Sequence, residues 1–223
     1  MFDSVEKIPH TEVRTIFKDS RGNLWFGTTD QGFKVANRFR NMFKGNKFLQ
    51  QEFKGKTVTS LCPDKAGNLW IATLRDGLYC YETASRKLHK VDDTHLFQDT
   101  GVGYVRTSKV FCDSEGDLWL LFTDKMRVVQ CRYKNGRLTP LASLFVFNPM
   151  SIAEDDQGYI WIGGFSSTLI RYCKKDKSFT PVPVAAENEW TFVTDLLLEE
   201  PGKLLRVRLA FFPRRHDAKM LME

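Results

Sequence analysis

The sequence lacks a long apolar run, and it lacks the apolar core of a signal peptide. No apolar run in the 223 residues approaches the roughly 20 residues that a membrane-spanning helix needs. Residues 1–13 also lack the basic start and apolar stretch of a secretory signal. We therefore expect no membrane segment in this chain. We expect the chain, if expressed as given, to stay in the cytoplasm.

Paired cysteines are absent as well. The five cysteines are scattered singly, without a CxxC pair or a Cys/His cluster at the spacing of zinc ligands. An odd number also argues against a complete disulfide framework. We expect free, structural thiols, no metal site and no other cofactor. The cysteines are Cys62, Cys80, Cys112, Cys131 and Cys173.

The motifs of common catalytic sites are missing too. No HExxH, GxSxG, GxGxxG or Walker-type loop occurs. The four histidines, at positions 10, 89, 95 and 216, share no repeat position. Asp155 and Asp156 form a carboxylate pair, but Asp155 occupies a turn position of the repeat described below, which explains it without catalysis. We expect no catalytic residue and no enzyme activity in this chain.

Most of the chain has little excess charge of either sign. Six basic and two acidic residues lie from Lys203 onward, so four of the six net positive charges belong to the last 21 residues. A nucleic-acid footprint should instead form a basic face of the folded domain. Asn37–Phe48 alternates basic and aromatic residues, which fits a nucleic-acid surface or an outer strand pair with its charges in solvent. We favour the strand pair and expect no bound nucleic acid.

The sequence does contain strong self-similarity. Copies of one ten-residue pattern are anchored on a glycine, and the anchors lie 42 to 49 residues apart. Repeats of this period indicate propellers, solenoids or arrays. The copies are DSRGNLWFGT (Asp19–Thr28), DKAGNLWIAT (Asp64–Thr73), DSEGDLWLLF (Asp113–Phe122), DDQGYIWIGG (Asp155–Gly164) and a weaker EEPGKLLRVR (Glu199–Arg208), with anchors Gly22, Gly67, Gly116, Gly158 and Gly202.

One repeat already predicts the local structure. In the second copy, short apolar segments alternate with polar, glycine-containing turns, which indicates four antiparallel strands in about 45 residues. No amphipathic helix is evident, so helical repeats are excluded. We predict an all-β chain, a β-propeller of about four complete four-stranded blades plus a partial fifth. The blade cores are expected near 13–50, 58–95, 107–145, 150–186 and 190–205.

Four of the five tryptophans occupy one column of the repeat: Trp25, Trp70, Trp119 and Trp161. We predict that they fill the gaps between neighbouring blades, which fits this regular placement better than a sugar-stacking platform. Small residues follow two positions later, where strands should crowd. These are Gly27, Ala72 and Gly163, with Leu121 breaking the column.

The pattern D-x-x-G-N-L-W-I-G-T, followed by G-L-x-x-Y, resembles the two-component regulator propeller repeat. It is carried by Asp19–Thr28 with Gly32-Phe33, and by Asp64–Thr73 with Gly77-Leu78 and Tyr81. In that family the blades form the extracytoplasmic sensor of hybrid two-component proteins, common in Bacteroidetes, and many members sense oligosaccharides. The resemblance implies a periplasmic sensor segment, with an oligosaccharide ligand and a homodimer or second propeller as partner. The kinase of such a protein is absent from this chain.

The chain also departs from the family pattern. It has fewer repeats than a closed ring usually needs, and the column of Gly32 and Gly77 becomes Met126 and Thr168. We expect one propeller domain over 1–205. Residues 206–223 are basic and fit no blade by sequence, which indicates a frameshifted or truncated gene, with an engineered fragment or an unusual natural end as the alternatives.

Loops at one end of the blades are the predicted ligand rim, because propeller loops converge there. One loop set joins the second and third strands of each blade, and the other leads into the first strand; Lys56 lies in the second set. Trp190 stands outside the repeat column and is the predicted stacking residue. A protein-binding scaffold without a small ligand remains the alternative function, and a lyase or glycosidase is disfavoured. The predicted ligand-binding residues are Asp30, Arg75, Asp76, Tyr104 and Trp190.

Overall fold

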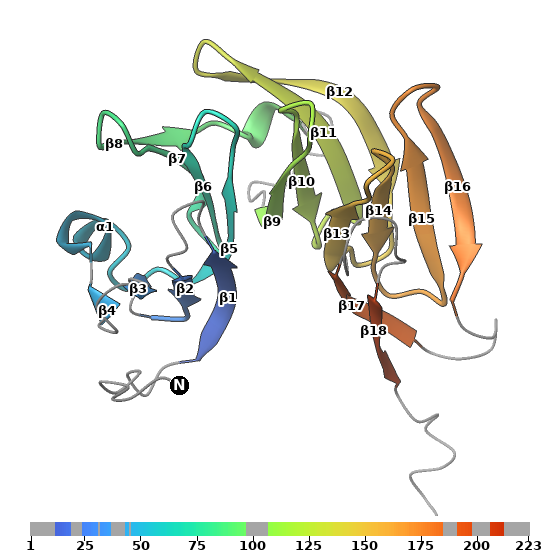
Figure 1. Cartoon of the computed structure of the whole chain (residues 1–223), viewed down its shortest axis with the longest axis horizontal. Coiled ribbons are helices and arrows are strands. Elements are labelled where there is room, and N and C mark those ends of the chain that lie inside the picture. The colour runs from blue at the N-terminus through green and yellow to red at the C-terminus, as the bar shows by residue number, and fades with distance from the viewer. Residues whose placement is uncertain are drawn as a thin grey trace, which may run out of the picture. The chain divides into compact units, whose positions relative to one another are not determined.

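The structure is a computed structural model, shown in Figure 1, and it describes residues 12–18, 24–30, 32–36, 43–44, 46–96, 107–184, 191–197 and 206–211. The chain divides into two compact units. The first unit comprises Met1–Cys112, Gly116–Leu120 and Val129–Ala142, and the second comprises Asp113–Glu115, Leu121–Val128 and Ser143–Glu223. Among the described residues, no helix is long and apolar enough to cross a membrane.

The described residues form four four-stranded sheets and one two-stranded sheet. Within each sheet the strands follow one another in chain order, which is the arrangement of a propeller blade. The strands are β1 (Val13–Lys18), β2 (Leu24–Thr28), β3 (Phe33–Ala36) and β4 (Phe43–Lys44); β5 (Val58–Pro63), β6 (Leu69–Thr73), β7 (Gly77–Glu82) and β8 (Lys87–Val91); β9 (Thr107–Cys112), β10 (Leu118–Phe122), β11 (Arg127–Lys134) and β12 (Arg137–Phe145); β13 (Ser151–Glu154), β14 (Ile160–Gly163), β15 (Thr168–Cys173) and β16 (Ser178–Pro183); β17 (Thr191–Leu197) and β18 (Arg206–Phe211).

The turn in each blade explains why the ten-residue pattern recurs along the chain. The Asp64 carboxylate accepts the backbone N–H of Asn68 at 2.8 Å and the indole N–H of Trp70 at 3.1 Å. In the fourth blade, the Asp155 carboxylate accepts the indole N–H of Trp161 at 2.8 Å. The aspartate therefore closes the turn and satisfies the polar end of the tryptophan six residues later.

The tryptophans pack where the sequence analysis predicted. Trp25 of the first blade packs against the buried core of the second, which includes Leu69 and Ile71. Trp70 of the second blade meets Tyr133 of the third edge to face, with ring centroids 4.8 Å apart. Trp161 packs against a core shared with β17. Trp25, Trp70 and Trp161 thus lie at seams between consecutive blades, and Trp119 is buried.

The small residues two positions later also lie where strands crowd. A Cβ built on Gly163 would lie 2.5 Å from both Ser151 Oγ and Val193 Cγ1, and one on Gly27 would lie 2.5 Å from Thr15 Cγ2. A serine hydroxyl also joins the two strands that meet at Gly163. Ser151 Oγ donates to the Val193 carbonyl at 2.9 Å.

The start of the fifth blade differs from the sequence prediction. We expected the chain from residue 206 onward to fit no blade, yet Arg206–Phe211 forms β18 and pairs antiparallel with β17. The register shift between Val193 and Asp195 lies nine residues before the repeat glycine. Shifts at the same repeat position interrupt β1 at Val13/Thr15 and β5 at Val58/Ser60. β17 and β18 are therefore the first two strands of a blade.

Of the predicted outer strand pair over Asn37–Phe48, residues 37–42 and 45 lie outside the described residues, and Phe43–Lys44 forms the strand β4. The prediction is wrong at its end, where the helix α1 spans Lys47–Glu52. The side chain of Asn46 caps this helix by accepting the Leu49 N–H at 3.2 Å. Leu49 and Phe53, four residues apart, are fully buried in the core of the second blade. The burial of this pair favours a helix over a strand.

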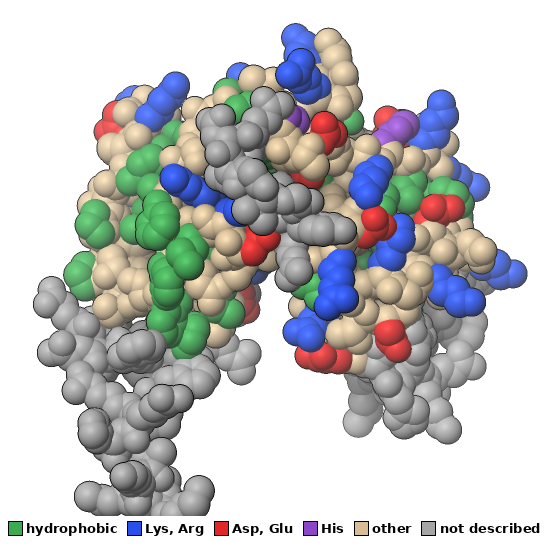
Figure 2. All heavy atoms as spheres, turned by 180° about the vertical axis from the view of Figure 1, so that it is seen from behind, with side chains coloured by type: hydrophobic (Ala, Val, Ile, Leu, Met, Phe, Trp, Pro, Cys, Tyr) green, Lys and Arg blue, Asp and Glu red, His purple; other side chains and the backbone are tan. Residues whose placement is uncertain are grey.

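All five cysteines are free thiols, as predicted. Burial raises the pKa of Cys80 and of Cys131 to about 12, so these two thiols are unreactive at neutral pH. Figure 2 shows Lys, Arg, Asp and Glu side chains scattered over one face of the molecule, beside a band of hydrophobic side chains.

Candidate functional site

The turn between β6 and β7 in the first unit is closed by its own backbone and one threonine. Thr73 Oγ1 donates to the Gly77 carbonyl at 2.8 Å and accepts the Asp76 N–H at 3.1 Å. Gly77 has a φ of 86°, a conformation that favours glycine. The first blade repeats this closure, because Thr28 Oγ1 donates to the Gly32 carbonyl at 2.8 Å. This local order places Asp76 at the end of the blade.

Four side chains meet at Asp76, and we call them the Asp76 cluster: Lys56, Asp76, Tyr79 and Lys90. Lys56 Nζ lies 2.6 Å from Asp76 Oδ2, and the Tyr79 hydroxyl donates to the same oxygen at 2.6 Å. Lys90 Nζ donates to Asp76 Oδ1 at 2.9 Å. Lys56 Nζ also donates to the Tyr79 hydroxyl at 3.1 Å. Each polar atom of the cluster is thus held by another member.

Aromatic rings form the inner wall of the cluster. The ring of Tyr79 is buried, and it meets the ring of Phe53 edge to face with centroids 5.1 Å apart. Lys56 Nζ lies 5.0 Å from the Tyr79 ring centroid and 5.5 Å from that of Phe53. These cation–π contacts fix the ammonium group in addition to its hydrogen bonds.

The charged groups of the cluster shift one another's pKa values. Burial by itself would raise the pKa of Asp76, but hydrogen bonds from Lys56, Tyr79 and Lys90 outweigh it and hold this pKa far below its usual range. Burial opposes the charge on Lys56, but its hydrogen bonds to Asp76 and Tyr79 raise its pKa above the usual value. The carboxylate and both ammonium groups are therefore charged at neutral pH.

The structure brings together some of the predicted rim residues. Asp76 and Lys56 come from the two predicted loop sets, and they are in direct contact. Arg75 is exposed beside them, and Asp30 lies in a neighbouring loop, where its carbonyl accepts the Gly55 N–H at 3.3 Å. Tyr104 and Trp190 lie outside the described residues, so their predicted role stays a prediction.

Sequence reasoning missed Tyr79 and Lys90. Both lie on strands, and Tyr79 faces Lys90 across the β7–β8 pair. The signal for Tyr79 was its place two residues after Gly77, on the side of the strand that carries the rim. No comparable signal marked Lys90, because its neighbour depends on the register of the hairpin.

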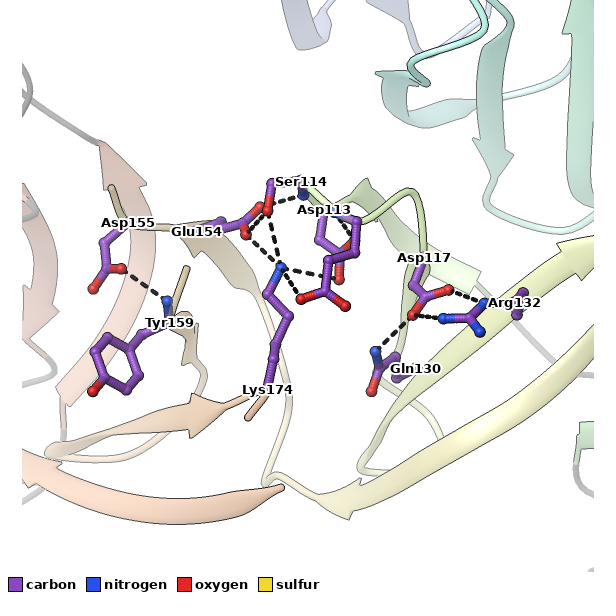
Figure 3. A network of polar contacts seen from close by, with 10 residues as sticks. Asp113, Ser114, Asp117, Gln130, Arg132, Glu154, Asp155, Tyr159 and Lys174 are labelled. Carbon is purple, nitrogen blue, oxygen red and sulfur yellow. Dashed lines mark hydrogen bonds and ion pairs between the residues drawn. The ribbon is translucent and has the colours of Figure 1, made fainter. Parts of the chain in front are cut away.

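A second polar cluster lies in the second unit, around Lys174 (Figure 3). Lys174 Nζ donates to Glu154 Oε1 at 2.5 Å and to Ser114 Oγ at 3.1 Å, and it lies 3.6 Å from Asp113 Oδ2. The side chain of Lys174 is only 8% exposed. Burial disfavours its charge, but the hydrogen bond to Glu154 and the charge of Asp113 raise the pKa of Lys174.

The Lys174 cluster lines a hollow of about 700 Å³ that also includes Tyr159 and Lys175. Its carboxylates already share one buried ammonium, which gives them a structural role. Among the described residues, no group of three His, Cys, Asp or Glu side chains is placed to hold a metal ion. The Asp76 cluster, two of whose four members come from the predicted ligand loops, is the better candidate for binding.

Three segments of the chain match a known protein family. The family described as two component regulator propeller matches residues 7–30, 52–75 and 141–166. The chain carries two-component regulator propeller repeats. The matched segments contain the turn of the first blade, the turn and β6 of the second blade and the turn of the fourth blade. The third copy of the ten-residue pattern, Asp113–Phe122, lies outside the matched segments, yet its blade has four strands like the others.

Solved structures resemble these regulator propeller repeats in fold. The extracellular domain of a putative hybrid two-component system from B. thetaiotaomicron has a TM-score of 0.69 at 19% identity, covering 98% of this chain and 30% of its own. A second such domain from the same organism has a TM-score of 0.59 at 18% identity, covering 93% of this chain and 32% of its own. Virginiamycin B lyase from Staphylococcus aureus has a TM-score of 0.61 at 11% identity, covering 84% of this chain and 60% of its own.

The regulator propeller chain thus spans about a third of the two sensor domains. Its fold is an incomplete β-propeller, as predicted: four four-stranded blades and two strands of a fifth. No curated protein matches the sequence. The presence of a lyase among the similar structures means that the fold alone does not decide between binding and catalysis.

Proposed function

We propose that this chain is a ligand-sensing propeller segment of a hybrid two-component regulator, and that it binds an oligosaccharide at the Asp76 cluster. The observation that carries this proposal is the convergence of Lys56, Asp76, Tyr79 and Lys90 at the rim, in a chain with regulator propeller repeats. Two of these residues come from the loop sets in which propellers commonly bind ligands.

The chemistry of the cluster suits a hydroxyl-rich ligand. Asp76 can accept from a sugar hydroxyl, and the two ammonium groups can donate to one. The side chains of Lys56, Asp76 and Lys90 are 30%, 35% and 57% exposed, so each is accessible from solvent while held in place. Such preorganisation lowers the entropic cost of binding. Arg75, exposed next to Asp76, adds a planar donor group.

In the intact regulator, binding would act by shifting a population. A ligand changes the output only if it binds one arrangement of the sensor more tightly than another. We propose that the occupied rim favours one arrangement of paired propellers and so biases a kinase on the other side of the membrane. The two similar sensor domains are extracellular, which supports a site outside the cytoplasm, in the periplasm, for this segment.

The test is a binding screen of the 223-residue chain against neutral and acidic oligosaccharides, followed by calorimetric titration. We expect at least one oligosaccharide to bind, and Asp76→Ala to weaken that binding by about tenfold, the effect of losing a charged hydrogen bond. Asp156→Ala is the matched control, because Asp156 is exposed in a turn of the second unit. Failure of every oligosaccharide to bind the folded chain would overturn the proposal and favour a protein-binding scaffold.

A further inference from the structure

The Asp76 cluster has more positive than negative charge, and this bears on the class of ligand that the proposed function requires. Two ammonium groups, on Lys56 and Lys90, contact one carboxylate. Arg75 adds an exposed guanidinium next to Asp76 in the chain. The directly bonded groups therefore have a net charge of +1, and the neighbouring arginine raises it to +2.

The geometry leaves ammonium hydrogens available. Lys56 donates to Asp76 and to Tyr79, and Lys90 donates to Asp76 Oδ1. An ammonium group has three donors. Because the two lysines hold different oxygens of the same carboxylate, their nitrogens are fixed on either side of it. An anion that approaches the lysines from solvent, away from the Asp76 carboxylate, can therefore accept from both ammonium groups while they keep their bonds to Asp76.

Nearby acids do not cancel this excess. The Asp93 carboxylate lies near Gly77, but Asp93 is 4% exposed and accepts the Thr107 hydroxyl at 2.6 Å. Burial raises the pKa of Asp93 above its usual value, and the Thr107 hydroxyl binds its carboxylate inside the protein, away from the solvent-facing side of the cluster. Asp30 lies on an exposed loop, where solvent screens its charge.

We infer that the Asp76 cluster selects an anionic oligosaccharide, whose carboxylate or sulfate group bridges Lys56 and Lys90. This inference rests on the proposed function and names its ligand class. Asp76 is then a positioning residue that holds the two ammonium groups, and Arg75 is a second anion contact. Charge-assisted hydrogen bonds to an anion are stronger than those to a neutral hydroxyl, so the acidic sugar outcompetes its neutral counterpart.

The experiment compares sugars that differ only in charge. The probes are an oligogalacturonate, the same oligosaccharide with its carboxylates methyl-esterified, and a sulfated galactose oligosaccharide. We expect the chain to bind at least one acidic probe about tenfold or more tightly than the esterified one. Binding of the oligogalacturonate would indicate recognition of a carboxylate, and binding of the sulfated probe would indicate recognition of a sulfate. The affinity is expected to fall as salt rises, because the contact is between charges.

The variants locate the contact. Lys90→Ala should weaken binding of the acidic probe about fivefold to tenfold, Lys90→Arg should retain most of it, and neither should alter binding of the esterified probe. Lys87→Ala is the matched control, because Lys87 is exposed at the other end of the same strand, β8. Circular dichroism melts of all three variants would establish that each is folded.

The outcomes separate the two claims. Tight binding of the esterified probe, unaffected by Lys90→Ala, would overturn the anionic ligand class and leave oligosaccharide sensing in place. Equal loss of affinity in Lys87→Ala and Lys90→Ala would overturn the assignment to this cluster. Absence of binding to any of the three probes and to the neutral oligosaccharides of the wider screen would overturn the proposed function itself.

Discussion

At the scale of single residues, the aspartate that opens the repeat has several partners within a short stretch of chain. Asp155 accepts the backbone N–H groups of Gln157 and Tyr159 at 3.0 and 2.8 Å, besides the indole N–H of Trp161. Removing the carboxylate would leave these donors without their acceptor. The cost of such a loss is larger than the net worth of one hydrogen bond.

We therefore predict that Asp155→Ala lowers the free energy of unfolding by about 2–3 kcal/mol. Its neighbour Asp156 is exposed, and Asp156→Ala should change that free energy by less than about 0.5 kcal/mol. Urea denaturation followed by tryptophan fluorescence measures both. Equal destabilisation by the two substitutions would show that the turn does not depend on the repeat aspartate.

The depressed pKa of Asp76 predicts a pH dependence of stability. Its folded pKa lies below that of the unfolded chain, about 3.9, so the charged cluster stabilises the fold above that pH. The stabilisation is lost as pH falls below about 4 toward the folded pKa. Asp76→Asn should therefore be less stable than the natural chain at pH 7, with a gap that narrows from pH 4 to pH 2.5. Urea denaturation at these three pH values checks this, and a gap independent of pH would contradict it.

How much of the site was predictable also depends on single residues. Asp76 and Lys56 could be predicted, because loop positions follow from the repeat. Tyr79 and Lys90 could not, since their meeting depends on the pairing of β7 with β8 and on which face of the strand each side chain occupies.

At the scale of secondary-structure elements, the seam between blades limits side-chain size. Gly163 in β14 leaves no room for a Cβ beside Val193 of β17 and Ser151 of β13. We predict that Gly163→Ala lowers the free energy of unfolding by about 1–3 kcal/mol through overpacking.

A second substitution makes this prediction specific. Val193→Gly removes Cγ1 and Cβ, the two Val193 atoms that the new Cβ would meet at 2.5 and 2.6 Å, so the double variant should be less destabilised than the sum of the two single changes. Thermal and urea denaturation of the four proteins give the coupling energy. If the two single changes in the free energy of unfolding simply added, the close approach of residues 163 and 193 would not contribute to the destabilisation.

The Lys174 cluster joins elements that are distant in sequence. Lys174 follows β15, Glu154 ends β13 and Asp113 follows β9. Because Asp113 and Glu154 are nearly buried, removing their cation leaves uncompensated negative charge. We predict that Lys174→Met lowers the free energy of unfolding by about 3 kcal/mol.

Lys175→Met is the matched control for Lys174→Met. Lys175 is exposed one residue later and has the same charge, so its loss should change stability by less than about 0.5 kcal/mol. Both variants are compared by urea denaturation at pH 7. If Lys174→Met were as stable as Lys175→Met, the buried ion pairs would contribute nothing.

At the scale of the whole molecule, the chain spans about a third of the length of the two sensor domains that it resembles. Its last described sheet has two strands, whereas the other four have four each. The end of β12 and the connection to β13 present Phe145, Phe147 and Met150, which are 58%, 44% and 37% exposed. Exposed hydrophobic side chains of this kind and short sheet edges favour association.

We therefore predict that the chain alone self-associates at micromolar concentrations. Sedimentation velocity should show a weight-average mass that rises with concentration, and Phe145→Ser should reduce the rise. Leu141→Ser, at a less exposed residue of the same strand, β12, is the control and should reduce it less. A single monomer species with a cooperative melt at all concentrations would contradict this prediction.

The sequence by itself determined the blade: the turn aspartate, the tryptophan six residues later and the strands between them. These features were predictable because the interactions that maintain them join residues only a few positions apart, as between Asp64 and Trp70. The tertiary structure decided which polar residues meet. Lys56 and Lys90 are 34 residues apart, and only the packing of β5 to β8 brings both to Asp76. Only the packed sheets likewise bring Lys174 to Ser114, 60 residues away.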